Sequence, residues 1–123
     1  KNITIWGLAF KPNTDDIREA PSIDIVRQLN SVGANLRLYD PEAAENFKKI
    51  FPESDKLRYF SDMYDSLEKS DALIILTEWE HFISSDLEKI KNTMKLPIII
   101  DGRNIFDEDV VESYGFEYYS IGR

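Results

Sequence analysis

The chain has 123 residues, of which 42% are hydrophobic and 31% charged, the composition of one globular domain that buries about two thirds of its unfolded surface. Its formal net charge of −8 argues against a general nucleic-acid surface, because such surfaces are basic. The sequence contains no cysteine, which excludes a disulfide framework, a thiolate metal site and a cysteine nucleophile within these residues.

The apolar runs of the sequence are short. Leu73–Leu76 and Pro97–Ile100 fall far below the roughly 20 residues of a membrane-spanning helix, and Lys1–Ile5 has a strand pattern without the shape of a cleavable signal. We therefore expect no membrane partner and a cytoplasmic setting. A small anionic ligand is still compatible with an acidic chain, because carboxylates more than about 10 Å away are screened by salt.

Six segments have the alternating or continuous apolar pattern of β-strands. In chain order these segments are Ile3–Gly7, Asn35–Tyr39, Leu57–Phe60, Ala72–Thr77, Pro97–Ile100 and Phe116–Ile121. The continuous run Ala72–Thr77 is the strongest of them and is typical of a strand that is covered on both faces of a sheet.

Segments with helical spacing separate the strands. Pro21 suits the first turn of a helix that ends before Gly33, since glycine is the usual residue just beyond a helix C-terminus. The later helical segments are Glu42–Phe51, a helix capped by Asp62, a helix with Leu87, Ile90 and Met94 capped by Ser84 or Ser85, and Asp107–Tyr114.

This alternation predicts an α/β fold: a doubly wound, mainly parallel six-stranded sheet of Rossmann-like order 3-2-1-4-5-6, with helices on both faces. A five-stranded flavodoxin-like order is the alternative. In both folds ligands bind beyond the carboxyl ends of the strands, above all at the loop after the first strand. No linker or repeat interrupts the pattern, so we expect residues 1–123 to form a single domain.

The segment from Gly7 to Ser22 connects the first strand to the first helix. It has a single glycine and is about ten residues longer than the G-x-G-x-x-G turn that holds a dinucleotide pyrophosphate. We therefore expect that this domain does not bind the pyrophosphate of NAD in the usual way. The loop offers Phe10, Lys11 and Arg18 instead, which suit a flat base and a diphosphate.

A purely structural interpretation of the same loop is open. Lys11 is then solvated, Phe10 belongs to the core, and Arg18 pairs with Asp15, Asp16 or Glu19. The adjacent acids Asp15 and Asp16 are better explained by hydrogen bonds within the loop than by acid–base chemistry, because adjacent side chains usually point apart.

Other strand ends fall on the same edge of the predicted sheet. Arg103 follows Asp101-Gly102 and suits a diphosphate clamp, with an ion pair to Asp107 as the structural alternative. Asp40 stands where a dinucleotide fold has its ribose-binding acid, yet a turn initiated by Asp before Pro explains it equally well.

Trp79 and His81 carry weaker signals. Trp79 could stack on a base, although packing is the commoner role of a tryptophan at a strand end. His81 is the only histidine and has no second ligand in view, so we expect a surface or capping role and no metal site.

These motifs resemble the C-terminal, UDP-binding domain of the UDP-glucose/GDP-mannose dehydrogenase family. The matching segments, in the same order and over essentially the whole chain, are Gly7–Ser22, Tyr39–Pro41, Leu76–Trp79, Asp101–Asn104 and Ser120–Arg123. Within the family, residues 9–19 are most similar to bacterial UDP-glucose 6-dehydrogenases.

The resemblance implies an enzyme that oxidises C6 of UDP-glucose to UDP-glucuronate while two NAD molecules are reduced. By this analogy Phe10 and Lys11 contact the UDP-sugar, Arg103 belongs to the UDP site, and Arg18 reaches towards NAD. The family's catalytic cysteine and NAD-binding domain lie N-terminal to this domain, and a long central helix makes the dimer. We therefore expect no catalytic residue in 1–123 and an isolated fragment without activity, with UDP-glucose and the protein's own N-terminal domain as partners.

Two alternatives are kept open. The same domain of a UDP-N-acetylhexosamine or GDP-mannose dehydrogenase differs only in the ligand, and a non-catalytic nucleotide-binding module would use the same loop. A receiver-like signalling domain is excluded, because it needs acids directly after the first strand, an Asp ending the third strand and a Lys after the fifth, where this chain has Gly7-Leu8, Ser61 and Arg103.

Overall fold

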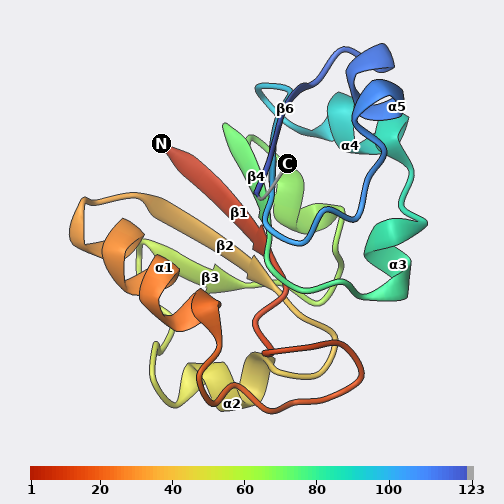
Figure 1. Ribbon diagram of the computed structural model, residues 1–123. Helices are drawn as coiled ribbons and strands as arrows, with labels where there is room; N and C mark the ends of the chain where they lie inside the picture. The colour runs from red at the N-terminus through yellow and green to blue at the C-terminus, as the bar shows by residue number, and fades with distance from the viewer. Residues whose placement is uncertain (122–123) are drawn as a thin grey trace.

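The computed structural model describes residues 1–121 and contains one sheet of six parallel strands in the order β3-β2-β1-β4-β5-β6 (Figure 1). The strands are β1 (Asn2–Trp6), β2 (Asn35–Tyr39), β3 (Leu57–Tyr59), β4 (Ala72–Ile75), β5 (Ile98–Asp101) and β6 (Glu117–Ser120). The doubly wound order predicted from the sequence is confirmed, and the flavodoxin-like alternative is excluded. Gly122 and Arg123, which end the last matching motif, lie outside the described residues.

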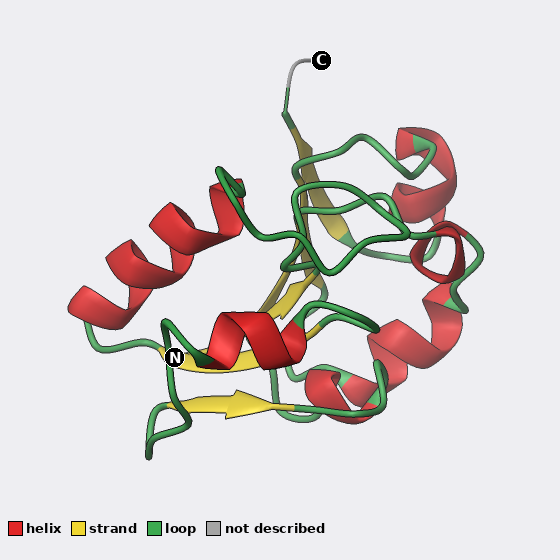
Figure 2. Ribbon diagram, turned by 90° about the horizontal axis from the view of Figure 1, so that it is seen from below, coloured by secondary structure: helices red, strands yellow, loops and turns green. Residues whose placement is uncertain are grey.

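The helices lie on both faces of this sheet (Figures 1 and 2). They are α1 (Pro21–Ser31), α2 (Ala44–Lys48), the 3-10 helix η1 (Asp65–Leu67), α3 (Glu80–Ile83), α4 (Leu87–Thr93) and α5 (Glu108–Ser113). The helices α1 and α2 cover one face and α3, α4 and α5 the other, as expected when right-handed crossovers run outwards in both directions from a central strand.

The core consists of two clusters, one on each face, because successive strand residues point to opposite sides. In β1, Ile5 belongs to the cluster under α1 and α2, and Trp6 belongs to the cluster under the other helices. The fully buried Trp6 ring stacks on Phe82 at 4.9 Å between centroids. The central strand is thus held from both faces, and its carboxyl end is a fixed platform for the loop that follows.

Two of the predicted helices differ in the structure. The segment after Asp62 is only a 3-10 turn, in which Asp62 Oδ1 accepts hydrogen bonds from the amides of Tyr64 and Asp65. The predicted helix Glu42–Phe51 is reduced to α2.

The expected serine cap of α4 is wrong. Asp86 caps this helix and accepts a hydrogen bond from the Lys89 amide, at 3.1 Å. The hydroxyls of Ser84 and Ser85 donate instead to carbonyls of the preceding turn, which forms the additional short helix α3. A carboxylate is the stronger acceptor at a helix N-terminus, which explains why Asp86 has this position.

Within residues 1–121, no helix has the length and apolar character needed to cross a bilayer.

Candidate functional site

All six strands are parallel, so the loops that follow them meet at one edge of the sheet. The loop after β1 begins at Gly7, whose φ is +99°. A β-carbon on Gly7 would lie 2.5 Å from Thr77 Oγ1 in the segment after β4. Only glycine permits this close approach, which brings the loops after β1 and β4 into direct contact.

The first amides of the loop are bound by a side chain. The buried Asp40 carboxylate, at the end of β2, accepts hydrogen bonds from the amides of Leu8 at 2.7 Å and Ala9 at 3.0 Å through Oδ2. Its other oxygen accepts from the amides of Glu42 and Ala43, both at 2.8 Å. With both oxygens occupied, Asp40 has no capacity left for a ribose, so the ribose-binding interpretation is wrong.

The middle of the loop projects away from the core. Phe10 is 49% exposed and Lys11 is also exposed, so Phe10 is not a core residue. Two hydrogen bonds fix the base of this projection: Thr77 Oγ1 donates to the Ala9 carbonyl at 2.8 Å, and the Phe10 amide donates to the Asp16 carbonyl at 3.0 Å. The aromatic ring and the ammonium group are therefore available to a ligand from a restrained backbone.

Arg18 forms an ion pair with Asp16, one of the three carboxylates that the structural interpretation left open. Asp16 Oδ1 accepts from the backbone amide and Nε of Arg18, and Oδ2 accepts from Nη2 at 2.8 Å. The hydrogen bonds from the Arg18 side chain lower the pKa of Asp16 from 3.8 to about 2. The Arg18 side chain remains 86% exposed, so its outer N–H groups are open to a further anion.

Arg103 pairs with Glu78, and the predicted alternative partner Asp107 instead caps α5. Nε and Nη2 of Arg103 both donate to Glu78 Oε2, at 3.1 and 2.6 Å. The backbone amide of Arg103 donates to Asp101 Oδ1 at 3.0 Å. Arg103 is therefore held by its backbone and by its side chain.

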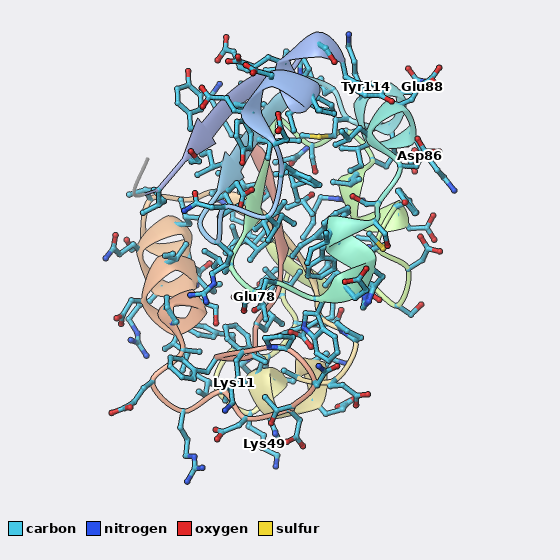
Figure 3. All side chains as sticks on the ribbon, turned by 45° about the vertical axis from the view of Figure 1, so that its right-hand side comes forward. Lys11, Lys49, Glu78, Asp86, Glu88 and Tyr114 are labelled. Atoms are coloured by element: carbon cyan, nitrogen blue, oxygen red, sulfur yellow. The ribbon has the colours of Figure 1, made fainter. Side chains whose placement is uncertain are left out.

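Arg103 and the loop after β1 lie on the two sides of β4, because the sheet order places β4 between β1 and β5. Figure 3 shows Lys11 towards one end of the molecule and Glu78 nearer its middle, with Tyr114 and Glu88 at the opposite end. Phe10, Lys11 and Arg103 thus stand in loops that follow β1 and β5 at the same edge of the sheet. Arg18 lies apart from them, in a cavity of about 590 Å³ that it shares with Lys49 and Ile50 of the α2 region.

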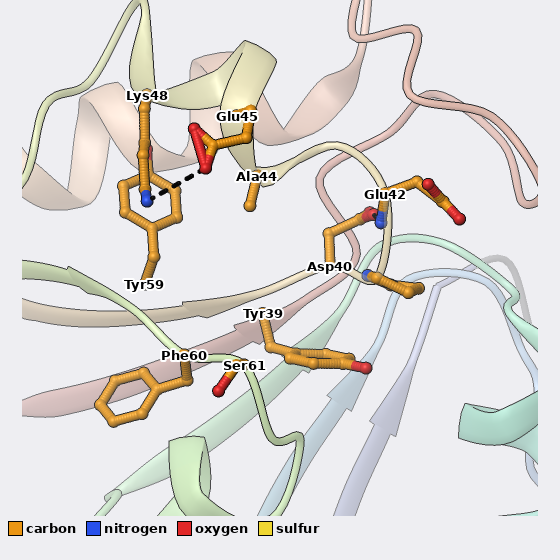
Figure 4. Close-up of a pocket in the computed structure, with 10 residues that line it drawn as sticks. Tyr39, Asp40, Glu42, Ala44, Glu45, Lys48, Tyr59, Phe60 and Ser61 are labelled. Carbon is orange, nitrogen blue, oxygen red and sulfur yellow. Dashed lines mark hydrogen bonds and ion pairs between the residues drawn. The ribbon is translucent and has the colours of Figure 1, made fainter.

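A separate cavity of about 500 Å³ opens at the carboxyl ends of β2 and β3 (Figure 4). Three carboxylates line it, those of Asp40, Glu42 and Glu45, against a single cation, Lys48. Lys48 is paired with Glu45 at 3.6 Å and lies over the Tyr59 ring. The excess of negative charge makes this cavity unsuitable for a phosphate.

Trp79 and His81 are packing residues. Trp79 is 7% exposed and belongs to the core, which confirms packing as its main role, although its Nε1 is buried without a partner among the described residues. His81 lies half-buried against the rings of Tyr39, Trp79 and Phe82 rather than in the expected surface role. No group of three or more His, Asp or Glu side chains within residues 1–121 is placed to hold a metal ion.

The sequence model of the UDP-glucose/GDP-mannose dehydrogenase family, UDP binding domain, matches residues 4–108. The chain belongs to this family. Among curated members, it is 46% identical over 121 residues to the UDP-glucose 6-dehydrogenase of Rhizobium meliloti, covering 98% of this chain and 27% of that protein. It is 42% identical over 123 residues to the UDP-glucose 6-dehydrogenase TuaD of Bacillus subtilis, covering 100% of this chain and 26% of TuaD. The chain thus spans about a quarter of the length of these family members.

Solved structures in the family share the fold. The UDP-D-ManNAc dehydrogenase of Pyrococcus horikoshii superimposes with a TM-score of 0.77 at 34% identity, covering 98% of this chain and 25% of that one. A UDP-glucose dehydrogenase from Pyrobaculum islandicum gives a TM-score of 0.72 at 30% identity over 85% of this chain and 22% of that one. The Rossmann-like arrangement of this domain is therefore common to family members with different named substrates.

Reasoning from the sequence placed Thr77 and Glu78 in a strand-end motif at this edge but assigned neither of them a partner or a role. Each contacts a partner far along the chain: Glu78 binds Arg103, 25 residues away, and Thr77 binds Ala9, 68 residues away. Their place at the end of the strongest predicted strand and within a matching family segment did not identify these partners, because the partner of a strand-end side chain depends on the sheet order.

Proposed function

We propose that this domain binds the nucleotide end of UDP-glucose in an NAD-dependent UDP-glucose 6-dehydrogenase, with Phe10, Lys11 and Arg103 contacting the UDP-sugar and Arg18 contacting NAD. The reaction converts UDP-glucose to UDP-glucuronate and reduces two NAD molecules. The chemistry itself falls to an N-terminal domain outside these 123 residues, which binds NAD and supplies the nucleophile. The intact protein works in the cytoplasm as a homodimer or a higher oligomer.

The observation that carries this proposal is the pair of exposed cationic groups, Lys11 and Arg103, that flank the end of β4 at the ligand-binding edge of the sheet. A diphosphate requires such groups, and the exposed ring of Phe10 beside Lys11 offers a surface for a base or sugar. The similarity to curated UDP-glucose 6-dehydrogenases at 38% to 46% identity supports UDP-glucose as the ligand.

The hydrogen-bonded amides after β1 support the proposal that NAD is bound by the N-terminal domain and that this domain binds the UDP end of the substrate. Asp40 takes the amides of Leu8 and Ala9 that a dinucleotide fold would offer to a pyrophosphate. Binding of the non-reacting UDP end would position the sugar C6 against groups of the other domain, so that binding energy is used for orientation.

The intact protein tests the site assignment. Lys11→Ala and Arg103→Ala should each raise the KM for UDP-glucose by about thirtyfold or more, because each removes a charge-assisted contact to a phosphate. Lys95→Ala is the matched control, since Lys95 is exposed near the amino end of β5, away from the ligand edge. Near-normal kinetics in both site variants would contradict the assignment.

The division of labour has its own test. Residues 1–123 alone should bind UDP at most weakly and should not reduce NAD in the presence of UDP-glucose. Any turnover above a blank without protein would place the chemistry within this domain and overturn that part of the proposal.

A further inference from the structure

We propose that Glu78 is a positioning residue of the nucleotide site, which holds the guanidinium of Arg103 so that its free edge faces the diphosphate. The proposal rests on the function proposed above, because it takes Arg103 as a diphosphate ligand. It adds a residue that would not touch the ligand and that acts through Arg103.

The geometry of the ion pair leaves half of the guanidinium available. Both contacts of Arg103 to Glu78, from Nε at 3.1 Å and from Nη2 at 2.6 Å, go to the single oxygen Oε2. Guanidinium has five N–H donors in a rigid plane. The two hydrogens of Nη1 and the second hydrogen of Nη2 are therefore left for a phosphate, which can bind without breaking the contact to Glu78.

The backbone of Arg103 is fixed to the same strand end as Glu78. The Gly102 amide donates to the Ile75 carbonyl at 2.8 Å, and a β-carbon at Gly102 would lie 2.9 Å from that carbonyl oxygen. Asp101 Oδ1 accepts the Arg103 amide. Glu78 therefore restrains a side chain whose base is already immobile, and together they define one orientation of the guanidinium.

The Glu78 carboxylate has no other use in the described part of the fold. Its second oxygen, Oε1, is buried and has no hydrogen-bond partner within residues 1–121. A buried acceptor without a partner destabilises a fold, and replacement by an apolar group of similar shape is often neutral or stabilising. A carboxylate at this position is therefore explained by its contact with Arg103 and not by a contribution to folding.

Glu78 has two opposing effects on an anionic ligand. Its negative charge repels a phosphate. Its hydrogen bonds to Arg103, in contrast, restrict the rotamers of the Arg103 side chain before the ligand binds, and this restriction should increase the affinity for the ligand about tenfold. The side chain of Glu78 is 32% exposed, and its charge is already paired with Arg103 behind the free edge. We therefore expect the restraint to dominate.

A double-mutant cycle on the affinity of the intact protein for UDP, measured by calorimetry, tests this role. Glu78→Ala should weaken UDP binding about tenfold, and Glu78→Gln, which retains an acceptor for Arg103, should weaken it less. In the Arg103→Ala background, Glu78→Ala should not weaken UDP binding further, because Glu78 acts on the ligand only through the Arg103 side chain. A merely structural role would produce the same loss in both backgrounds.

Glu88→Ala is the control, since Glu88 is exposed at the opposite end of the molecule (Figure 3). Tighter UDP binding by both Glu78 variants would overturn the proposal, because repulsion would then dominate; equal losses with and without Arg103 would also overturn it. If Arg103→Ala itself leaves UDP affinity unchanged, the site assignment of the proposed function fails, which is a distinct result. Should Glu78→Ala fail to fold, Glu78→Gln in both Arg103 backgrounds gives the same test.

Discussion

The Oδ2 atom of Asp40 lies 2.7 Å from the amide of Leu8, so a carboxylate of the chain itself binds the first amide of the loop after β1. In dinucleotide folds the amides at this place, together with a helix N-terminus, face the pyrophosphate. Here the Asp40 carboxylate, at the end of β2, accepts the hydrogen bonds of these amides in place of a pyrophosphate. The amides of Leu8 and Ala9 are therefore not available to an external anion, and under the function proposed above side chains further along the loop, such as Lys11, bind the diphosphate instead.

Asp40→Asn should lower the free energy of unfolding by about 2–4 kcal/mol, because an amide nitrogen would face two of the four backbone donors that the carboxylate now satisfies. Urea denaturation measures the change. Asp55→Asn is the control, since Asp55 is exposed and should change stability by less than about 0.5 kcal/mol. Equal stability of the two variants would mean that these hydrogen bonds contribute little.

The strand order and the edge at which the strand-end loops meet could be predicted from the sequence, because both follow from local patterns. Apolar runs such as Ala72–Thr77 identify strands, and the alternation with helices leaves one common topology. The pair Arg18–Asp16 was also among the possibilities, since its partners are two residues apart.

The pairs that shape the site were not predictable in this way. Asp40 and Leu8 are separated by 32 residues, and Glu78 and Arg103 by 25, so neither contact has a local signal. Their side chains meet only after the sheet order is set. For the same reason Asp107 was the nearer but incorrect partner proposed for Arg103.

Gly7→Ala should destabilise the domain by at least about 2 kcal/mol, because alanine would adopt a φ of +99° and its β-carbon would clash with Thr77. Gly33→Ala separates the two causes. Gly33 also has a positive φ, of +82°, but its nearest neighbour would be the flexible end of Lys56 at 3.7 Å. In thermal unfolding, the Tm of Gly7→Ala should be well below that of Gly33→Ala. The reverse order of the two Tm values would show that the contact between the ends of β1 and β4 is not tight.

The carboxyl of Asp16 should titrate at about pH 2, below its ordinary value of 3.8, as followed by NMR of its side-chain carbon. Because the pKa is lowered in the folded protein, the pair with Arg18 stabilises the loop fully above pH 3.8 and is lost as the pH falls through about 2. In Arg18→Ala the midpoint should return part of the way towards 3.8, since the side-chain hydrogen bonds from Arg18 are the largest cause of the shift while the backbone amide of residue 18 can still donate to Asp16. An unchanged midpoint in that variant would assign the low pKa to another group.

Thr77→Val should loosen the ligand loop while preserving the packing at the end of β4. Valine fills the space of threonine but cannot donate to the buried Ala9 carbonyl, which Thr77 Oγ1 reaches at 2.8 Å, and the loss should cost about 1–3 kcal/mol. The Phe10 amide, bonded to the Asp16 carbonyl across the loop, should then exchange its hydrogen faster. Thr93→Val removes a comparable hydroxyl bond from an exposed helix and should leave Phe10 exchange unchanged. If Phe10 exchanges equally in both variants, Thr77 does not restrain the loop, and the orientation of Lys11 must come from the ligand or from the rest of the protein.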